Sequence, residues 1–262
     1  MRLPIYQIDA FTDRVFAGNP AAVVPLEAWL PDATMQAIAA ENNLAETAFF
    51  VGEGDEYALR WFTPTVEVDL CGHATLAAAF VIFERLAPTR DRVAFQTLKA
   101  GTLTVARAAD RLMLDFPLWC PAPVATPAAL SEALGRAPAA TLLARERYVA
   151  VFGNEEEVAA LAPDFRALAR IGGDGVVATG PGHGDCDFVS RYFAPAAGID
   201  EDPVTGSSHC VLVPYWAERL GKTRLRARQV SRRGGDLFCA LDGDRVSIAG
   251  RAVLYLEGMI TI

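Results

Sequence analysis

Three short segments of the sequence hold the side chains best suited to acid–base chemistry. In the first, Glu46 stands directly before an apolar stretch in the run ENNLAETAFFV. A carboxylate at the mouth of a buried strand can be half-buried, a position that suits a general acid or base. The alternative is a solvated glutamate at an exposed strand end. The residues around Glu46 leave both interpretations open.

The second segment places a histidine beside a glycine at the start of another apolar run. His73 follows Gly72, and from there its ring can donate a hydrogen bond to a substrate or to Glu46. Because a helix N-terminus disfavours imidazolium, we expect His73 to be neutral. A buried histidine that only completes the core or caps the helix is the alternative.

The third segment, Glu201 to Ser208, packs two acids and three hydroxyls around Gly206. Helix capping accounts for one of these hydroxyl groups but not for all of them. Asp202 is therefore a second acid–base candidate. Ser207, directly after the glycine, is a candidate polar contact for a ligand.

Other polar residues have simpler explanations. We expect His209 to be satisfied within the core and His183, in a glycine-rich loop, to be solvated. Arginines at every second position from Arg224 to Arg228 would share one face of a strand, which we interpret as a solvated face. An anion or partner site on that face stays open as the alternative.

Gly72 and Gly206 occupy matched positions in an internal repeat. Each glycine comes after a Phe-x-Pro triplet and is followed 12 residues later by Glu-Arg-Leu. The same alignment places His73 opposite Ser207. Further matched features, including two Pro-Asp pairs and two Gln-to-Gly spacings, occur in the same order in both halves. Chance does not explain this agreement, so the chain is built from two similar halves.

Each half is predicted to contain strands, a short helix, further strands, one long buried helix and a β-hairpin. The short helices begin at Pro31-Asp32 and Pro163-Asp164. The predicted strands that follow them span 47–51 and 175–179, and the hairpins turn at 109–110 and 242–243.

The long helices position the candidate site. Residues 74–83 are apolar on all sides, so a sheet should surround this helix; its counterpart at 210–217 is similar, with a kink expected at Pro214. Helices starting at Gly72 and Gly206 would each present backbone N–H groups and a partial positive charge. If the halves face each other, both N-termini point into one cleft that suits a carboxylate. Alternatively, the two glycines only permit tight turns.

The composition indicates a globular protein that binds neither nucleic acid nor a membrane. With 24 basic and 32 acidic residues, the net charge of −8 repels nucleic acid. No apolar run reaches the roughly 18 residues of a membrane-spanning helix. Proline and polar residues interrupt the N-terminal run MRLPIYQIDAF, so we expect a cytoplasmic protein. The five cysteines lack disulfide or structural zinc spacing and are expected to be reduced.

Sequence signatures of several large enzyme classes are missing. The chain has no GxGxxG after a predicted strand, no phosphate-binding P-loop, no HExxH and no GxSxG. We therefore expect neither a nucleotide cofactor nor a metal.

Four stretches of the chain resemble a known family. They are IDAFTDRVFAGNPAAVV, ENNLAETAFF, RWFTPTVEVDLCGHATLAAA and YFAPAAGIDEDPVTGSSHCVLVPYW. In order and spacing they are similar to the PhzF-like isomerases, relatives of the diaminopimelate epimerase fold, over nearly the whole chain. The resemblance implies an α+β fold of two pseudo-symmetric lobes. Each lobe would be a curved mixed β-sheet wrapped around a central helix, with the site between the lobes.

The proline-rich run LDFPLWCPAPVATPAAL marks the boundary between the halves, because its prolines forbid a continuous helix or central strand. We expect an N-terminal lobe at 1–116 and a C-terminal lobe at 117–250. The resemblance implies that a last strand, within 251–262, completes the first lobe, and that the protein is a homodimer.

The resemblance also assigns roles to individual residues. It places the catalytic positions at Glu46 (acid–base), His73 (cleft histidine) and Asp202 (second acid), and the substrate contacts at Asn19, Gly72, Gly206 and Ser207. One departure narrows the chemistry. The related epimerases carry a Cys-Gly pair before each helix, whereas this chain has Cys71-Gly72 but Thr205-Gly206. A two-thiol racemase mechanism is therefore not open to it.

These observations predict a cofactor-independent isomerase that moves a proton on a small carboxylate-bearing substrate. Two alternatives remain. An epimerase or dehydratase of an amino or hydroxy acid would use Asp202 or Cys71 as a second proton carrier. A non-catalytic protein that binds a small acid would keep the cleft without turnover.

Overall fold

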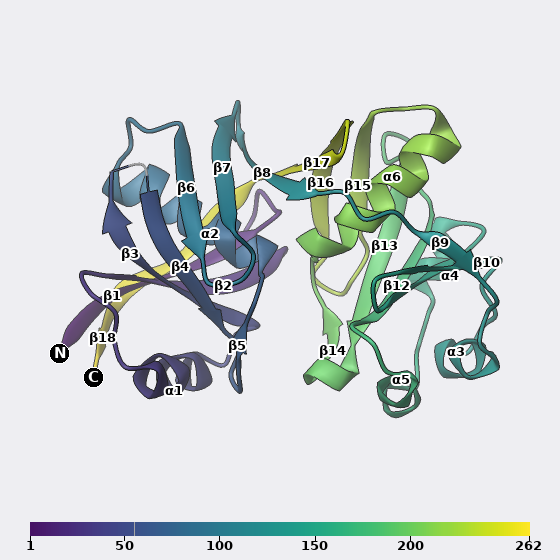
Figure 1. Cartoon of the computed structure of the whole chain (residues 1–262), viewed down its shortest axis with the longest axis horizontal. Coiled ribbons are helices and arrows are strands. Elements are labelled where there is room, and N and C mark those ends of the chain that lie inside the picture. The colour runs from purple at the N-terminus through teal and green to yellow at the C-terminus, as the bar shows by residue number, and fades with distance from the viewer. Residues whose placement is uncertain (55) are drawn as a thin grey trace. The chain divides into compact units, whose positions relative to one another are not determined.

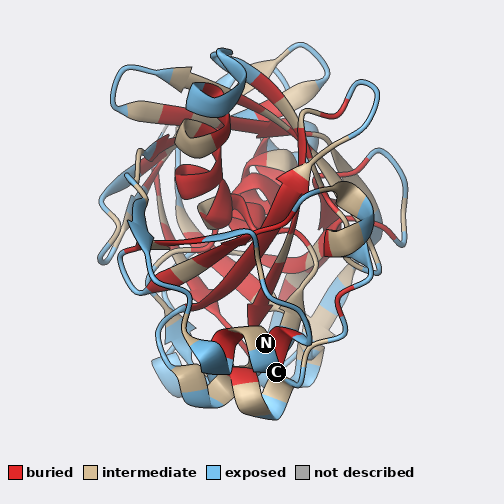
Figure 2. Cartoon of the chain, turned by 90° about the vertical axis from the view of Figure 1, so that its right-hand side faces the viewer, coloured by how far each residue is buried: buried red, intermediate tan, exposed pale blue. Residues whose placement is uncertain are grey.

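The computed structural model describes residues 1–54 and 56–262. These residues form two compact units, each a mixed β-sheet with helices (Figure 1). Unit 1 comprises Met1–Asp115 together with Ile248–Ile262, and unit 2 comprises Phe116–Ser247. In both units the buried residues follow the strands and the central helix, while exposed residues concentrate in the loops (Figure 2).

The sheet of unit 1 combines antiparallel and parallel neighbours. β1 pairs with both β2 and β18, so the two ends of the chain lie side by side. The parallel pairs are β2–β3 and β4–β6. The strands are β1 (Arg2–Ala10), β2 (Asn19–Leu26), β3 (Glu46–Glu53), β4 (Glu56–Phe62), β5 (Glu67–Val68), β6 (Arg92–Thr97), β7 (Thr102–Ala108), β8 (Arg111–Pro117) and β18 (Ala252–Thr261).

The central helix of unit 1 is α2 (Gly72–Val81), which a π-helical turn, Ile82–Leu86, extends. Every residue of α2 except Phe80 is buried, and the helix packs against β1, β2 and β3. The predicted all-apolar helix is thus confirmed. Burial on all sides follows from its composition, since no polar face exists to meet water.

Helix α1 (Asp32–Asn42) begins after Pro31, as predicted, and covers part of the same sheet. Its buried residues Met35 and Ile38 join a cluster with Val24 of β2 and Phe49 of β3.

Unit 2 repeats this plan with a larger helical layer. The parallel pairs are β11–β12 and β13–β15. The strands are β9 (Ala122–Val124), β10 (Ala140–Ala144), β11 (Arg147–Val151), β12 (Gly175–Pro181), β13 (Phe188–Ala194), β14 (Ile199–Asp202), β15 (Arg224–Gln229), β16 (Gly235–Asp242) and β17 (Arg245–Gly250). The α-helices are α3 (Ala128–Leu134), α4 (Glu155–Ala159), α5 (Phe165–Ile171) and α6 (His209–Leu220), and the 3-10 turns are η2 (Pro195–Ala197) and η3 (Gly206–Ser208).

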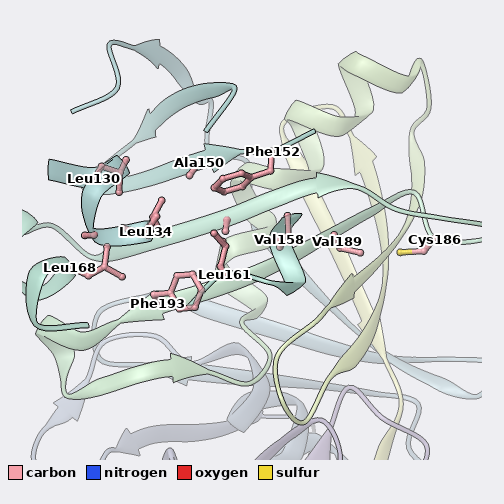
Figure 3. Packing of buried hydrophobic residues seen from close by; sticks show 13 residues of the cluster. Leu130, Leu134, Ala150, Phe152, Val158, Leu161, Leu168, Cys186, Val189 and Phe193 are labelled. Atoms are coloured by element: carbon pink, nitrogen blue, oxygen red, sulfur yellow. The ribbon is translucent and has the colours of Figure 1, made fainter. Parts of the chain in front are cut away.

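Three short helices of unit 2 pack on its sheet through one apolar cluster (Figure 3). Leu134 of α3, Val158 of α4 and Leu168 of α5 meet there with Phe193 of β13. Each large side chain in such a cluster stabilises the fold by about 1.5–3 kcal/mol. Helix α5 starts where the Pro163-Asp164 pair predicts, because the Asp164 carboxylate accepts a hydrogen bond from the Ala167 N–H at 3.0 Å.

The second long helix differs from its prediction at its start. Residues Gly206–Ser208 form a 3-10 turn, and the α-helix begins only at His209. Pro214 has no N–H to donate to the carbonyl of Cys210, four residues earlier. That carbonyl accepts instead from the Trp119 N–H at 3.0 Å. The proline thus brings the segment after β8 onto the first turn of α6.

No helix in the described part of the chain has both the length and the apolar composition to cross a bilayer.

Candidate active site

Two neighbouring parallel strands of unit 1 begin at the same end of its sheet, and the first residue of each is polar. Asn19 opens β2 and is fully buried, and Glu46 opens β3 with a side chain that is 13% exposed. The register pairs Ala21 with Glu46. Just before β3, Asn43 adopts a left-handed conformation (φ 49°) that ends α1 and turns the chain into the strand. The carboxylate is thus largely buried but still reachable, a position that suits a general acid or base.

Helix α2 brings the third polar residue to the same place. Cys71 precedes the helix in an extended conformation, and Gly72 and His73 form its first turn. The Thr75 hydroxyl donates to the Cys71 carbonyl at 2.6 Å, which fixes the start of the helix. His73 is 3% exposed, so the fold rather than solvent determines the position of its ring.

The imidazole of His73 bridges the two strand ends. Its Nδ1 lies 3.1 Å from Asn19 Nδ2, and its Nε2 lies 3.1 Å from Glu46 Oε2. The second contact is within ion-pair distance, but its angles do not make a hydrogen bond, so Glu46 Oε2 is buried without a hydrogen-bond partner among residues 1–54 and 56–262. Catalytic contacts are often poorly aligned before substrate binds. Asn19 can serve either charge state of the ring, because turning its amide exchanges donor for acceptor.

The charges of this cluster follow from burial and proximity. Burial, helped by the nearby Glu46, raises the pKa of the Cys71 thiol to about 11, so the thiol is protonated at neutral pH. Burial lowers the pKa of His73, but Cys71 and Glu46 raise it by more, and the net pKa lies well above the ordinary value. Since the thiol is neutral, the carboxylate of Glu46 is the anion that stabilises the imidazolium.

This result differs from the neutral His73 expected from the helix N-terminus. A helix dipole acts on a nearby charge with about 0.3–1 kcal/mol. Two opposite charges about 4 Å apart attract with about 4 kcal/mol at the effective dielectric constant of a protein surface. The Glu46 carboxylate at 3.1 Å therefore outweighs the dipole.

Cys71, His73 and Glu46 also offer a set of donors that could hold a metal ion. One atom from each lies within 4.8 Å of the others. A thiolate, an imidazole and a carboxylate are all zinc ligands, but Cys71 would first have to lose its proton. The absence of a metal stays an expectation from the sequence.

The remaining predicted residues come together in unit 2. Asp202 ends β14, and its carboxylate accepts a hydrogen bond from the Thr205 hydroxyl. Gln229 ties the loop from both sides, since it accepts from the Thr205 N–H at 2.9 Å and donates to the Asp202 carbonyl at 2.7 Å. Gly206 and Ser207 follow in the 3-10 turn that leads into α6.

Of the other two histidines, His209 is buried in the core, as expected, but only one of its ring nitrogens has a partner among the described residues, and His183 is exposed, as expected. His209 is fully buried, and its Nδ1 lies 2.9 Å from the Thr205 carbonyl, while its Nε2 has no partner within the described chain. Burial lowers the pKa of His209 to about 4, so this ring is neutral at physiological pH. His183 is exposed beside Glu156, at 3.1 Å. The arginines from Arg224 to Arg228 lie on β15, where the positions between them are buried.

One residue near Ser207 was not predicted. Arg147 is buried and donates to the Ser207 hydroxyl at 3.2 Å across 60 positions of sequence. Its neighbours in the chain give no sign of burial, because the charged residues Arg145 and Glu146 directly before it suggest an exposed turn. Only the β10–β11 hairpin, which pairs Ala144 with Arg147, places it inside.

A sequence model of a protein family decides the assignment of this chain. The model described as "PhzC-PhzF: Phenazine biosynthesis-like protein" matches residues 8–258. The chain belongs to the phenazine biosynthesis-like family. A member from Pseudomonas aeruginosa, described as an uncharacterized isomerase, is 53% identical over 262 residues and covers 100% of both chains. The predicted family and the predicted enzyme class, an isomerase, are confirmed.

Solved structures confirm the predicted fold class of this phenazine biosynthesis-like protein. The crystal structure of a PhzF-family protein from Enterococcus faecalis is 48% identical, covers 100% of both chains and has a TM-score of 0.96. A hydroxyproline epimerase from Agrobacterium vitis shares the fold alone. It is 12% identical, with a TM-score of 0.61 over 99% of this chain and 92% of its own.

Proposed function

We propose that this isomerase moves a proton on a small carboxylate-bearing substrate, without a cofactor, with Glu46 as the general acid–base. One observation carries the proposal. Glu46 Oε2 is buried at ion-pair distance from His73, but it has no hydrogen-bond partner among the described residues and so has a lone pair open to a proton.

The proposed reaction has two steps. Glu46 first takes a proton from a substrate carbon next to an electron-withdrawing group, which leaves a delocalised carbanion. It then returns the proton to another carbon of the same delocalised system. The imidazolium of His73, 3.1 Å from Glu46, stabilises the carboxylate between turnovers. Asn19 acts on the ring of His73 from the other side, at 3.1 Å.

The substrate carboxylate has a natural place at the start of α2. The first N–H groups of a helix have no acceptor within the helix and carry a partial positive charge. We therefore propose that Gly72 contributes backbone N–H contacts to the substrate. The assignments of Asp202 as a second acid, and of Gly206 and Ser207 as substrate contacts, rest on the family resemblance and are proposed on that basis.

Proton carriage by Cys71, as in a thiol-dependent epimerase, is less favoured. A thiol with a pKa of about 11 is a poor base near neutral pH, because almost none of it is ionised. Thr205 also stands where a second thiol would be needed.

Deuterium exchange tests the proposed function. The protein is incubated in D₂O with a panel of small cyclic and amino acids, and incorporation at carbon is followed by NMR. We expect exchange with at least one compound and a loss of about 100-fold or more in Glu46→Gln. Glu53→Gln, at the exposed far end of the same strand, is the matched control and should keep full activity. Exchange that survives in Glu46→Gln would refute the role of Glu46, and no exchange with any compound would favour a binding protein.

Two finer expectations remain proposals. We propose that the protein is cytoplasmic. We also propose that it is a homodimer, which the mass from light scattering of the purified protein would test. The exposed apolar side chains Tyr255, Leu256 and Met259 of β18 support a protein contact on that strand, since exposed apolar clusters mark interaction sites.

A further inference from the structure

Arg147 of unit 2 is a buried cation, and the acceptors around it do not satisfy all of its N–H groups. It opens β11 and is 7% exposed. A guanidinium has five N–H donors, and here Nη1 donates to Ser207 Oγ at 3.2 Å, whereas the buried Nε has no acceptor in the described chain. No carboxylate of residues 1–54 or 56–262 lies within ion-pair distance of it. A buried charge without a counter-charge is costly, so a ligand that supplies one is expected.

The ionisable side chains around Arg147 do not supply that counter-charge. Burial raises the pKa of Tyr192, so its hydroxyl is neutral; this hydroxyl donates to the Asp174 carbonyl. Burial likewise raises the pKa of Cys210 to about 12, so its thiol is neutral too. The Asp202 carboxylate accepts from the Thr205 hydroxyl.

Two aromatic rings lie close to the guanidinium of Arg147. The Cζ atom of Arg147 lies 4.6 Å from the ring centre of Tyr192 and 5.5 Å from that of Trp119. Such contacts stabilise the cation but supply no counter-charge. The buried Nε–H is left for an acceptor, and a carboxylate has the fork geometry that matches a guanidinium.

Trp119 adds a second donor without an acceptor. Its backbone is held by the Cys210 carbonyl that Pro214 leaves open, and its buried indole Nε1 has no hydrogen-bond partner among the described residues. A second cation, Arg145, lies 4.5 Å from the same ring. Two unpaired donors and two cations in one place all favour a ligand that is an anion and a hydrogen-bond acceptor.

We propose that Arg147 and Ser207, at the turn that leads into α6, bind the carboxylate group of an organic acid. This inference rests on the proposed function for the class of ligand, a small organic acid, and it concerns the residues of unit 2 alone. Arg147 provides the charge and the donor fork, and the Ser207 hydroxyl accepts from Arg147 while it donates to the ligand. The 3-10 turn and the N-terminus of α6 add partial positive charge.

Benzoate and benzamide form a matched pair of probes, because they differ mainly in the charge of one group. Binding is measured by calorimetry, and the Arg147 Nε–H signal is followed by ¹H–¹⁵N NMR and assigned by its loss in Arg147→Lys. We expect benzoate to bind and to shift this signal, and benzamide to do neither. Arg147→Met should weaken benzoate binding by about tenfold or more, with Arg147→Lys intermediate because it keeps the charge and loses the fork.

Several outcomes would overturn the inference. One is benzoate binding that is unchanged in a folded Arg147→Met protein, and another is sulfate binding as tightly as benzoate. If Arg147→Met does not fold, Ser207→Ala replaces it, and unaltered benzoate affinity in that variant would count against the site. Glu46→Gln separates the two proposals, since it should abolish exchange while benzoate still shifts the Arg147 signal.

Discussion

His209 makes the stability of unit 2 depend on pH, and the size of the effect follows from its burial. The ring is fully buried at the start of α6, its Nδ1 donates to the Thr205 carbonyl, and its pKa is lowered by burial to about 4. In the unfolded chain the pKa returns to 6.5. The unfolded state therefore binds a proton between pH 6.5 and about 4 that the folded state does not.

The sign and the magnitude follow from this difference. A lowered pKa contributes stability that is fully present above pH 6.5 and is lost as the pH falls toward 4. The difference between 6.5 and about 4 corresponds to about 3 kcal/mol of unfolding free energy. His209→Asn should remove this pH dependence, because the shorter amide keeps a donor for the Thr205 carbonyl and does not titrate.

Urea unfolding between pH 4 and pH 7.5, followed by tryptophan fluorescence and circular dichroism, measures the effect. The unfolding free energy of wild type minus that of His209→Asn should fall by about 3 kcal/mol from pH 7.5 to pH 4. His183→Asn, at an exposed histidine, controls for the loss of an imidazole. Parallel curves for wild type and His209→Asn would refute the assignment of a neutral buried ring.

Three further predictions concern single side chains. Glu46→Gln should lower the pKa of His73, because it removes the anion at 3.1 Å; NMR titration of the three histidines measures this, and an unmoved His73 signal would contradict it. Cys71→Ser should keep deuterium exchange within a few-fold of wild type, since the thiol is protonated near neutral pH, whereas a loss of about 100-fold would make Cys71 a proton carrier. Asp164→Ala should lower the unfolding free energy by about 1 kcal/mol through loss of the α5 cap, and an unchanged urea midpoint would exclude that role.

The sequence predicts those parts of the fold that depend on local rules. The apolar run after Gly72 has no polar face, so a buried helix is its only stable use, and α2 is that helix. The Pro-Asp pairs predict two helix starts by local rules: Asp164 caps α5 with its carboxylate, whereas α1 starts directly after Pro31 without a side-chain cap. Glu46 at the first position of β3 follows from the apolar run after it.

Features that depend on distant contacts could not be predicted in the same way. The charge of His73 is set by Glu46, 27 positions earlier, at a distance that only the folded sheet fixes. The local sequence predicts that Arg147 is exposed, whereas in the fold the β10–β11 hairpin and the turn at Ser207 bury it. The delayed start of α6 at His209 likewise depends on backbone geometry that the composition of the helix does not determine.

A double-mutant cycle on deuterium exchange tests most directly the claim that Glu46 and His73 act as one acid–base unit. Exchange rates are compared for wild type, Glu46→Gln, His73→Asn and the double variant, on one compound that the wild-type protein exchanges. Because the two groups lie 3.1 Å apart and share one function, the double variant should be no slower than Glu46→Gln alone. If the loss of exchange rate in the double variant equals the product of the two single-variant losses, Glu46 and His73 act independently, and the account is contradicted.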